Sequence, residues 1–520
     1  MSCCLSWRCL PLIVWFAVLS AAADAATFNG TVEDVSPDDR TITVKVAGKK
    51  AESKTFTLSP TAVVTIDGKK GKLEDVIEGQ TVTVAVNADD VTMKLTVKTP
   101  KNLTPKAPTS STASTTGKKT KEKEDERSAN DESAFWPQFR GPDRDNISPD
   151  TGLLDRWPDG GPSLAWQQKG LGEGYSSVSM ARGKLYSMGN QGDDEMVLAM
   201  DLAKGKPLWA TKTGGRAYRD GGQGNGPRGT PTIDDDRVYA LGANGDLVCV
   251  GAAKGEVVWQ RNILNEYGGN NIQWGISESV LIDGNNLICC PGGQRGTIVA
   301  INKMTGNNVW RAVVDGTPKA AYSSPILVEY EGERMYVNYV HTAVVAVRAK
   351  DGNLLWGHSA SANDTANCSS PLYSDGLIYT ASGYSKGAAM FKLLKGGKAK
   401  LEYENREMVN HHGGMVVLDG HVYGFDEQIL KCINLSTGKA VWKDRSVGKG
   451  SLTYADGHLY LRAENGPVAL CLATTKGYDE RGRFDPPKGT SQRPSWSHPV
   501  VCGGRLYLRD MDSLLVYKLK

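Results

Sequence analysis

Ionisable side chains occur at two places where the sequence otherwise prefers small residues. Short clusters such as YSSV (175–178), YSSP (322–325) and CSSP (368–371) recur along the chain. Glu278 stands where the other clusters have Ser or Gly, and His498 stands where they have Ser, Thr or Gly. A bulky ionisable group in a crowded position is costly unless it is paired or meets a ligand. We therefore expect Glu278 and His498 to belong to a binding site.

The position that opens each cluster adds charged and aromatic groups, and Trp274 lies just before Glu278 in GGNNIQWGISES (268–279). Together these residues predict a polar pocket with aromatic walls at one end of a channel. The expected ligand-binding residues are Arg228, Trp274, Glu278, Tyr322, His412, Lys449, Trp496 and His498. The structural alternative is that Arg228, Glu278 and Lys449 form an ion-pair network between neighbouring repeats. No catalytic residue is assigned.

Other candidate motifs predict neither a metal site nor a haem. His411 and His412 are adjacent, so their side chains would diverge on a strand, and no third ligand is spaced near them. Cys289 and Cys290 lie in an apolar run that is typical of a buried strand. The sequence contains no C-x-x-C-H, and its glycine-rich stretch at 213–229 lacks the Lys-Ser/Thr ending of a phosphate loop.

One phrase recurs through the C-terminal part of the chain, as in AINKMTGNNVW (300–310) and CINLSTGKAVW (432–442). It predicts a strand, a tight turn in which glycine takes a positive φ, and a second strand that ends in tryptophan. These tryptophans are Trp166, Trp209, Trp259, Trp310, Trp356 and Trp442. Spacing in the forties and low fifties with this content is typical of β-propeller blades, and the eight small-residue clusters predict eight blades.

The two ends of this region are expected to meet. The last small-residue cluster is followed by three strand-like runs, and SLAW (163–166) precedes the first cluster without a blade of its own. We predict that 163–166 pairs with 514–519 and completes the last blade, which leaves no free sheet edge there. The recurring tryptophan should pack between neighbouring blades.

The first part of the sequence predicts export and a separate small domain. Residues 1–25 have a basic Arg8, an apolar run that is too short to span a bilayer, and an A-x-A cleavage pattern, as in a signal peptide. The mature protein is therefore expected to be periplasmic or secreted, with no transmembrane segment. Residues 26–99 alternate apolar and polar positions as in a small β-barrel, and 100–134 read as a disordered linker before the propeller at 135–520.

Composition excludes some classes of partner. Lys and Arg number 61 against 58 acidic residues, so the chain lacks the basic field that nucleic-acid binding requires. Seven cysteines follow residue 25, most of them within apolar runs, which favours buried thiols over a disulfide framework.

The repeated phrase resembles the tryptophan-docking repeat of the eight-bladed pyrroloquinoline-quinone dehydrogenases. It is similar as well to the non-catalytic propeller of the outer-membrane barrel-assembly lipoprotein. Longer strings, WPQFRGPDRDNISPDTGLL (136–154) and HHGGMVVLDGHVYGF (411–425), look like exported bacterial proteins with quinone-binding-like propeller repeats. The resemblance extends from about Trp136 to the C-terminus. It implies an all-β chain with an eight-bladed propeller, and a fold alone does not fix a function.

Two functions are compatible with this resemblance. The first is an exported, non-catalytic module that binds or scaffolds a protein or glycan, with no cofactor. The alternative is a dehydrogenase of alcohols or sugars that uses pyrroloquinoline quinone and Ca²⁺. The resemblance implies that such an enzyme has oxygen ligands for Ca²⁺, a catalytic aspartate and a vicinal disulfide, for which Cys289-Cys290 is the one candidate. A complete set of these groups is not found, so the sequence favours the binding module.

Overall fold

The computed structural model describes two parts of the chain. In the first part it describes residues 26–36, 41–46, 52–66, 69–71, 73, 76–77, 79–86 and 92–98. In the second it describes residues 134–520 except 221, 223, 317–318 and 488–493. The expected signal peptide (1–25) and nearly all of the expected linker (100–134) lie outside the described residues. No helix in the described ranges is long and apolar enough to cross a membrane.

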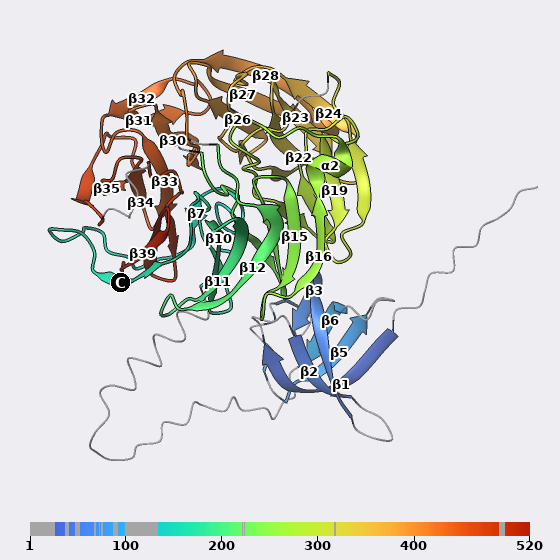
Figure 1. The fold of residues 1–520 in the computed structure, drawn as a ribbon. Coiled ribbons are helices and arrows are strands. Elements are labelled where there is room, and N and C mark those ends of the chain that lie inside the picture. Colours follow the sequence, from blue (N-terminus) through green and yellow to red (C-terminus); the bar gives the residue numbers. More distant parts are fainter. Residues whose placement is uncertain are drawn as a thin grey trace, which may run out of the picture. The chain divides into compact units, whose positions relative to one another are not determined.

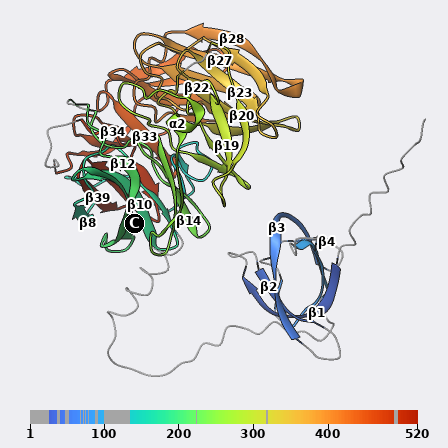
Figure 2. The ribbon, with the colours of Figure 1, turned by 45° about the vertical axis from the view of Figure 1, so that its right-hand side comes forward.

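The first part is a sheet whose strand pairings close on themselves. Its strands are β1 (Ala26–Ser36), β2 (Thr41–Val46), β3 (Glu52–Ile66), β4 (Lys69–Lys70), β5 (Thr81–Val86) and β6 (Thr92–Lys98). Pairing runs β2-β1-β5-β6-β3-β4, and β2 also pairs with β3, so five strands form a closed cycle. Figure 2 shows these strands curving around a common axis. Alternate residues such as Val82, Val84 and Val86 are buried inside, as the period-two pattern predicts.

The second part consists of eight small sheets, in which all strand pairings but one are antiparallel and most strands are consecutive. The first sheet contains β9 (Ser179–Ala181), β10 (Lys184–Gln191), β11 (Asp194–Asp201) and β12 (Pro207–Arg216), and the second contains β13 (Thr232–Asp234), β14 (Arg237–Leu241), β15 (Asp246–Gly251) and β16 (Val257–Asn262). The third contains β17 (Leu281–Asp283), β18 (Asn286–Cys289), β19 (Ile298–Asn302) and β20 (Asn308–Ala312), and the fourth contains β21 (Ile326–Tyr330), β22 (Glu333–Val340), β23 (Ala343–Arg348) and β24 (Leu354–His358). A short helix, α2 (Ile263–Tyr267), follows β16.

The other four sheets continue the same order around the ring in Figure 1. They are β25 (Leu372–Ser374), β26 (Leu377–Ser382), β27 (Gly387–Leu394) and β28 (Lys398–Asn405); β29 (Val416–Leu418), β30 (His421–Asp426), β31 (Ile429–Asn434) and β32 (Ala440–Asp444); β33 (Gly450–Ala455), β34 (His458–Ala463), β35 (Val468–Leu472) and β36 (Glu480–Phe484), joined by β7 (Ile147–Ser148); and β37 (Val500–Cys502), β38 (Arg505–Asp510), β39 (Ser513–Lys518) and β8 (Leu164–Lys169). A single 3₁₀ turn, η2 (Lys395–Gly397), joins β27 to β28.

The last sheet joins the two ends of this region. β8 pairs antiparallel with β39, from Ser513 opposite Lys169 to Tyr517 opposite Leu164. This register confirms the predicted pairing of 163–166 with the C-terminal strand. Closure satisfies backbone groups that would otherwise form an exposed sheet edge.

Recurring tryptophans join neighbouring sheets, as predicted. The indole Nε1 of Trp310 donates to the carbonyl oxygen of Ala349 in the following sheet at 3.1 Å. A Cβ added to Gly352 would lie 2.4 Å from Trp310 Cε3, so only glycine lets the ring lie flat on that turn. Trp209, Trp259 and Trp442 bond in the same way to Ala252, Lys303 and Thr474. In four phrases the glycine lies against the tryptophan of the phrase before it, at Gly205, Gly255, Gly306 and Gly352.

Tyrosine replaces tryptophan at one position in this series. Tyr403 lies opposite Met390, in the register that Trp310 has opposite Ala300. Its hydroxyl donates to the carbonyl oxygen of Leu435 in the next sheet at 2.7 Å. An aromatic ring with one polar donor is thus sufficient for this contact, and the gap between Trp356 and Trp442 is filled by Tyr403.

The small-residue clusters that lead into the first strand of each sheet, which we call the openings, form a ring of hydroxyl contacts around the channel. At four of the openings the backbone N–H donates to a hydroxyl of the next opening: Ser177 to Thr230 at 3.2 Å, Thr230 to Ser279 at 2.8 Å, Ser279 to Ser324 at 2.9 Å, and Ser324 to Ser370 at 3.3 Å. Ser177 Oγ also donates to the carbonyl oxygen of His498, which joins the first opening to the last. Small residues recur here because the openings touch one another. The second part of the chain is a β-propeller.

Residues 136–147, which we call the axial segment, cross the channel below this ring. Its side chains donate to carbonyls in or just before the first strands of three sheets: Arg140 to Met415 at 3.0 Å, Arg144 to Ser279 at 2.7 Å, and Asn146 to Leu452 at 2.6 Å. Arg140, Arg144 and Asn146 are buried and have a positive φ. The axial segment therefore connects the sheet that begins with β17 to the two neighbouring sheets that begin with β29 and β33.

Candidate functional site

A cavity of about 310 Å³ lies at the other end of the channel, above the hydroxyl ring. Six of the eight residues that the sequence predicted line it: Arg228, Trp274, Tyr322, His412, Lys449 and Trp496. Each belongs to a segment that leads into the first strand of a sheet, and these segments come from six different sheets. The propeller thus brings together residues that are far apart in sequence.

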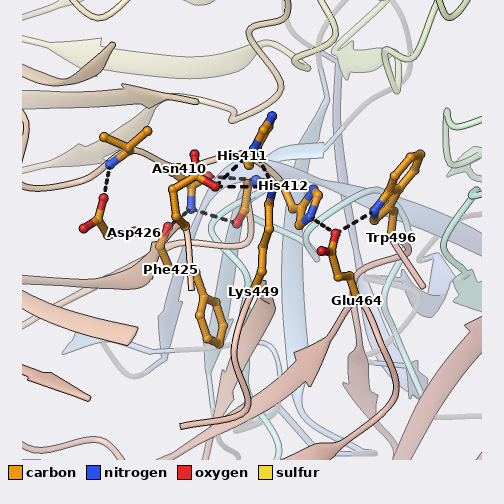
Figure 3. Close-up of polar contacts among 11 residues, drawn as sticks. Asn410, His411, His412, Phe425, Asp426, Lys449, Glu464 and Trp496 are labelled. Carbon is orange, nitrogen blue, oxygen red and sulfur yellow. Dashed lines mark hydrogen bonds and ion pairs between the residues drawn. The ribbon is translucent and has the colours of Figure 1, made fainter. Parts of the chain in front are cut away.

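A buried asparagine shapes the segment that carries the two histidines. Asn410 is fully buried, its Nδ2 donates to the carbonyl oxygen of Phe425 at 3.0 Å, and its Oδ1 accepts from the N–H of Gly413 at 2.8 Å. Residues 411 and 412 form a bend before β29, and their rings stack at 5.6 Å (Figure 3). The expectation that adjacent histidine side chains diverge is wrong, because it assumed that they lie on a strand.

His412 and Trp496 share one carboxylate. Glu464 Oε2 lies 2.8 Å from His412 Nε2 and accepts from the indole Nε1 of Trp496 at 3.1 Å (Figure 3). The bond from His412 is the main reason that the pKa of Glu464 is lowered to about 2. Glu464 is therefore ionised at every physiological pH, and it fixes two rings of the cavity wall.

A second polar group holds His411. Lys449 Nζ donates to His411 Nδ1 at 2.6 Å and forms an ion pair with Glu427 at 3.4 Å. The same Nδ1 lies 3.5 Å from Glu427 Oε2, so Lys449, His411 and Glu427 form one cluster. Burial, with the Lys449 charge second, lowers the pKa of His411, so this ring is neutral near pH 7.

Arg228 lies between two pairs of aromatic rings. Its guanidinium carbon is 5.1 Å from the Tyr175 ring, which contacts Trp496 at 4.7 Å. Arg228 Nη1 donates to the carbonyl oxygen of Trp274 at 2.7 Å, and Trp274 contacts Tyr322 at 5.6 Å. Arg228 thus lies over a ring of one aromatic pair and bonds to the backbone of the other.

The charge of Arg228 has no counterion at ion-pair distance among the described residues. Its Nη1 bonds are to the carbonyl oxygens of Gly224 and Trp274. Burial lowers its pKa, and Asp220 is the weakest of the groups that oppose this shift. The carboxylate of Asp220 accepts from the amides of Gly222 and Gly224 instead. The other charged groups of the wall, Lys449 and Glu464, already have partners of their own.

Four further polar or aromatic residues line the cavity and were not predicted there: Cys368, Tyr384, His411 and Glu464. Cys368 is the first residue of the cluster CSSP, the position that Arg228 has in its own cluster. This column of first positions could therefore have predicted Cys368 as a lining residue. Tyr384 lies in the β26–β27 turn and Glu464 follows β34, where no column marks them. Burial raises the pKa of the Cys368 thiol to about 11, so this cysteine is not an activated nucleophile.

Glu278 does not line the cavity, which corrects its place in the predicted site. It is 2% exposed and lies below the cavity, where its Oε2 accepts from the N–H of Cys290 at 3.1 Å. Burial raises its pKa to about 8, opposed in part by the charge of Arg144. The alternative network is corrected too, because the cation near Glu278 is Arg144 of the axial segment, and neither Arg228 nor Lys449 bonds to it.

His498 is also enclosed and does not line the cavity. Its Nε2 donates to the carbonyl oxygen of His412 at 2.7 Å, and its ring lies 5.1 Å from Phe139 of the axial segment. Burial is the main reason that the pKa of His498 is lowered to about 4, so the ring is neutral near pH 7. His498 connects the floor of the cavity to the axial segment.

The residues that line the cavity do not fit a bound Ca²⁺. Calcium takes six to eight oxygen ligands. Glu464 supplies the one carboxylate of the lining, and it is bonded to His412 and Trp496. No group of three His, Cys, Asp or Glu side chains in the described ranges could hold a metal. Cys289 and Cys290 are buried free thiols outside the lining, and Cys290 Sγ accepts from Asn338 Nδ2.

The sequence matches the family model described as outer membrane protein assembly factor BamB. The matches cover residues 161–298 and 193–444, which together span more than half of the 520-residue chain. No protein with a curated description matches the chain.

Solved structures show the same fold at low sequence identity. Quinohemoprotein alcohol dehydrogenase from Comamonas testosteroni is 13% identical over 76% of this chain and 82% of that chain, with a TM-score of 0.54. Quinohemoprotein alcohol dehydrogenase ADHIIG from Pseudomonas putida HK5 is 14% identical over 75% and 81%, with a TM-score of 0.51. BamB from Moraxella catarrhalis is 14% identical over 69% and 98%, with a TM-score of 0.49. At these identities the likeness concerns the fold alone.

Proposed function

We propose, from the premise that the chain belongs to the family of the outer membrane protein assembly factor BamB, that it is an exported, non-catalytic binding module whose cavity takes the end of an acidic glycan. The observation that carries the proposal is Arg228, a cation without a counterion between two aromatic walls. An anionic group on the ligand would supply the missing charge. Flat aromatic faces suit the C–H faces of a sugar ring, since the π-system is negative and those hydrogens are positive.

The size of the cavity favours a sugar over a protein surface. A volume of about 310 Å³ is at the small end of the range for small-molecule sites. A stable protein interface buries roughly 800 Å² on each partner, which needs a broad surface and not one enclosed pocket. The axial segment crosses the channel below, so a ligand enters from the opposite end.

The architecture that we propose for this function has three parts. The eight sheets are the blades of one propeller, and the cycle of strands β1–β6 is a small barrel. The leader at residues 1–25 directs the protein to the periplasm or the exterior, where extracellular glycans are available.

The test uses digalacturonate as the acidic probe and its methyl ester as the uncharged control. We expect titration calorimetry to detect binding of digalacturonate, and at least tenfold weaker binding of the ester. Arg228→Met should reduce affinity for digalacturonate to that of the ester, whereas Arg228→Lys should keep part of the difference. Equal affinity for both probes would contradict the role of Arg228. Binding of an acidic peptide in place of either sugar would favour a protein ligand.

The alternative is a dehydrogenase that uses pyrroloquinoline quinone and Ca²⁺, and the neighbouring quinohemoprotein structures motivate it. The lining does not fit the metal, so we derive no reaction step through this cofactor. Purified protein mixed with the quinone and Ca²⁺ should show neither cofactor absorbance nor dye-linked oxidation of alcohols. Either signal would replace the binding proposal with the enzymatic one.

A further inference from the structure

The β26–β27 turn carries an unusual backbone at the edge of the cavity. The turn spans residues 383–386, and the N–H of Lys386 donates to the carbonyl oxygen of Gly383 at 3.1 Å. Its two central residues, Tyr384 and Ser385, have φ values of 54° and 62°. Such a turn is type I′, in which Asn and Gly are strongly preferred at both central positions.

Other turns of the propeller use the residues that this geometry prefers. In five hairpins between a first and a second strand, the residue with positive φ is followed by glycine: Arg182-Gly183, Glu331-Gly332, Asp375-Gly376, Asp419-Gly420 and Asp456-Gly457. Among the described residues, Tyr384 and Ser385 are the one pair of consecutive non-glycine residues with positive φ. A bulky residue in this region costs backbone energy, and such costs persist mainly at functional sites.

The turn is pressed against the histidine pair. A Cβ added to Gly383 would lie 2.9 Å from His411 Cδ2, so glycine is needed for this close approach. The ring of Tyr384 meets the His411 ring edge-on, with the centroids 4.4 Å apart. His411 is itself fixed by Lys449, so both sides of the contact are held.

This backbone places the Tyr384 side chain at the mouth of the cavity. Tyr384 lines the cavity and yet is 40% exposed. No hydrogen-bond partner of its hydroxyl is found among the described residues. A partly exposed aromatic ring that is held in place by the backbone, with an unbonded hydroxyl, is suited to contact a ligand that enters.

We propose that Tyr384 is a ligand-contact residue that determines specificity at the mouth of the cavity, and that its strained turn is kept to hold it there. This inference rests on the proposed function and adds a residue that no column of the repeat identifies. The ring covers one side of the entering sugar, and its hydroxyl donates to a sugar oxygen. Ser385 has the same backbone conformation but does not line the cavity, which makes it a matched control.

The experiment compares Tyr384→Asn, Tyr384→Phe and Ser385→Gly with the wild-type chain, using digalacturonate as the probe. Ser385→Gly should raise the melting temperature and leave affinity unchanged, since it relieves strain without touching the cavity. Tyr384→Asn should keep the melting temperature at or near that of the wild type and lower affinity at least tenfold. Tyr384→Phe should retain most of the stacking and lose about threefold through the hydroxyl.

The outcomes separate this inference from the proposed function. Equal binding of digalacturonate by the wild type and Tyr384→Asn would overturn the role of Tyr384 and leave the proposed function standing. A wild-type chain that does not bind digalacturonate would overturn both. A tenfold loss in Ser385→Gly as well would show that the turn acts through its backbone and not through the tyrosine ring, which would also overturn the inference.

Discussion

Tryptophan occurs both at the outer contacts between sheets and at the mouth of the channel, and its role differs between the two regions. At the outside, Trp310 is 9% exposed, lies on Gly352 and bonds to Ala349, and other phrases repeat this arrangement. At the mouth, Trp274 and Trp496 are half-buried, and no two sheets contribute the same set of groups. A feature that every repeat shares serves the ring, whereas a feature that one repeat alone has is free to serve a ligand.

The largest effect is expected at the outer contact. Trp310→Ala should lower the free energy of unfolding by about 3–5 kcal/mol, because it empties a packed site and leaves the Ala349 carbonyl without its donor. Thermal or urea denaturation followed by circular dichroism measures this loss.

A neighbouring exposed residue provides the control for Trp310. Val309→Thr should change stability by less than about 0.5 kcal/mol, since Val309 is 49% exposed on the same strand. Equal losses in the two variants would contradict the view that the tryptophan holds adjacent sheets together. Lys303 is unsuitable as this control, although its place in the turn suggests exposure, because its ammonium forms an ion pair with Asp234 of the preceding sheet.

The repeated part of the fold was predictable from sequence because residues that recur at the same position in several repeats indicate a shared structural role. The tryptophan column, the small-residue clusters and the pairing of 163–166 with the C-terminal strand all follow from counting. The axial segment was not predictable in this way. It occurs once, and its arginines find backbone carbonyls that no local pattern reveals.

A smaller effect is expected below the cavity, at the buried Glu278. Its pKa of about 8 means that the folded chain keeps a proton that the unfolded chain loses above about pH 4.5. Rising pH therefore favours the unfolded state through this window. Between pH 6.5 and 8, the free energy of unfolding should fall by about 2 kcal/mol more in the wild type than in Glu278→Gln.

Between pH 6.5 and 8 the titration of the buried histidines contributes little to the change in stability. The lowered pKa values of His411 and His498 act in the opposite direction, since stability from them is lost as pH falls below about 6.5. Urea denaturation at pH 6.5 and 8 tests the difference between the two chains. Parallel pH profiles for the wild type and Glu278→Gln would show that Glu278 is ionised in the folded chain.

The cavity itself was predictable in part, for a physical reason. Residues in the column that opens each cluster share one height along the channel, so Arg228, His412 and Lys449 had to lie near one another. Glu278 and His498 each lie further along their clusters, and this shift lowers them beneath the cavity floor. Tyr384 and Glu464 come from turns between later strands, and their reach toward the axis depends on backbone geometry that sequence columns do not report.

The smallest effect on stability is expected at the mouth, with the same substitution that is most damaging outside. Trp274→Ala should lower the free energy of unfolding by only about 1 kcal/mol, because water can enter the space that the half-buried ring leaves. It should nevertheless reduce affinity for digalacturonate at least tenfold, since one aromatic wall beside Arg228 is lost. Trp310→Ala, measured at a temperature where it stays folded, should bind the probe as the wild type does. If Trp274→Ala were as destabilising as Trp310→Ala, the mouth would be part of the packing of the ring, and the contrast between the two regions would fail.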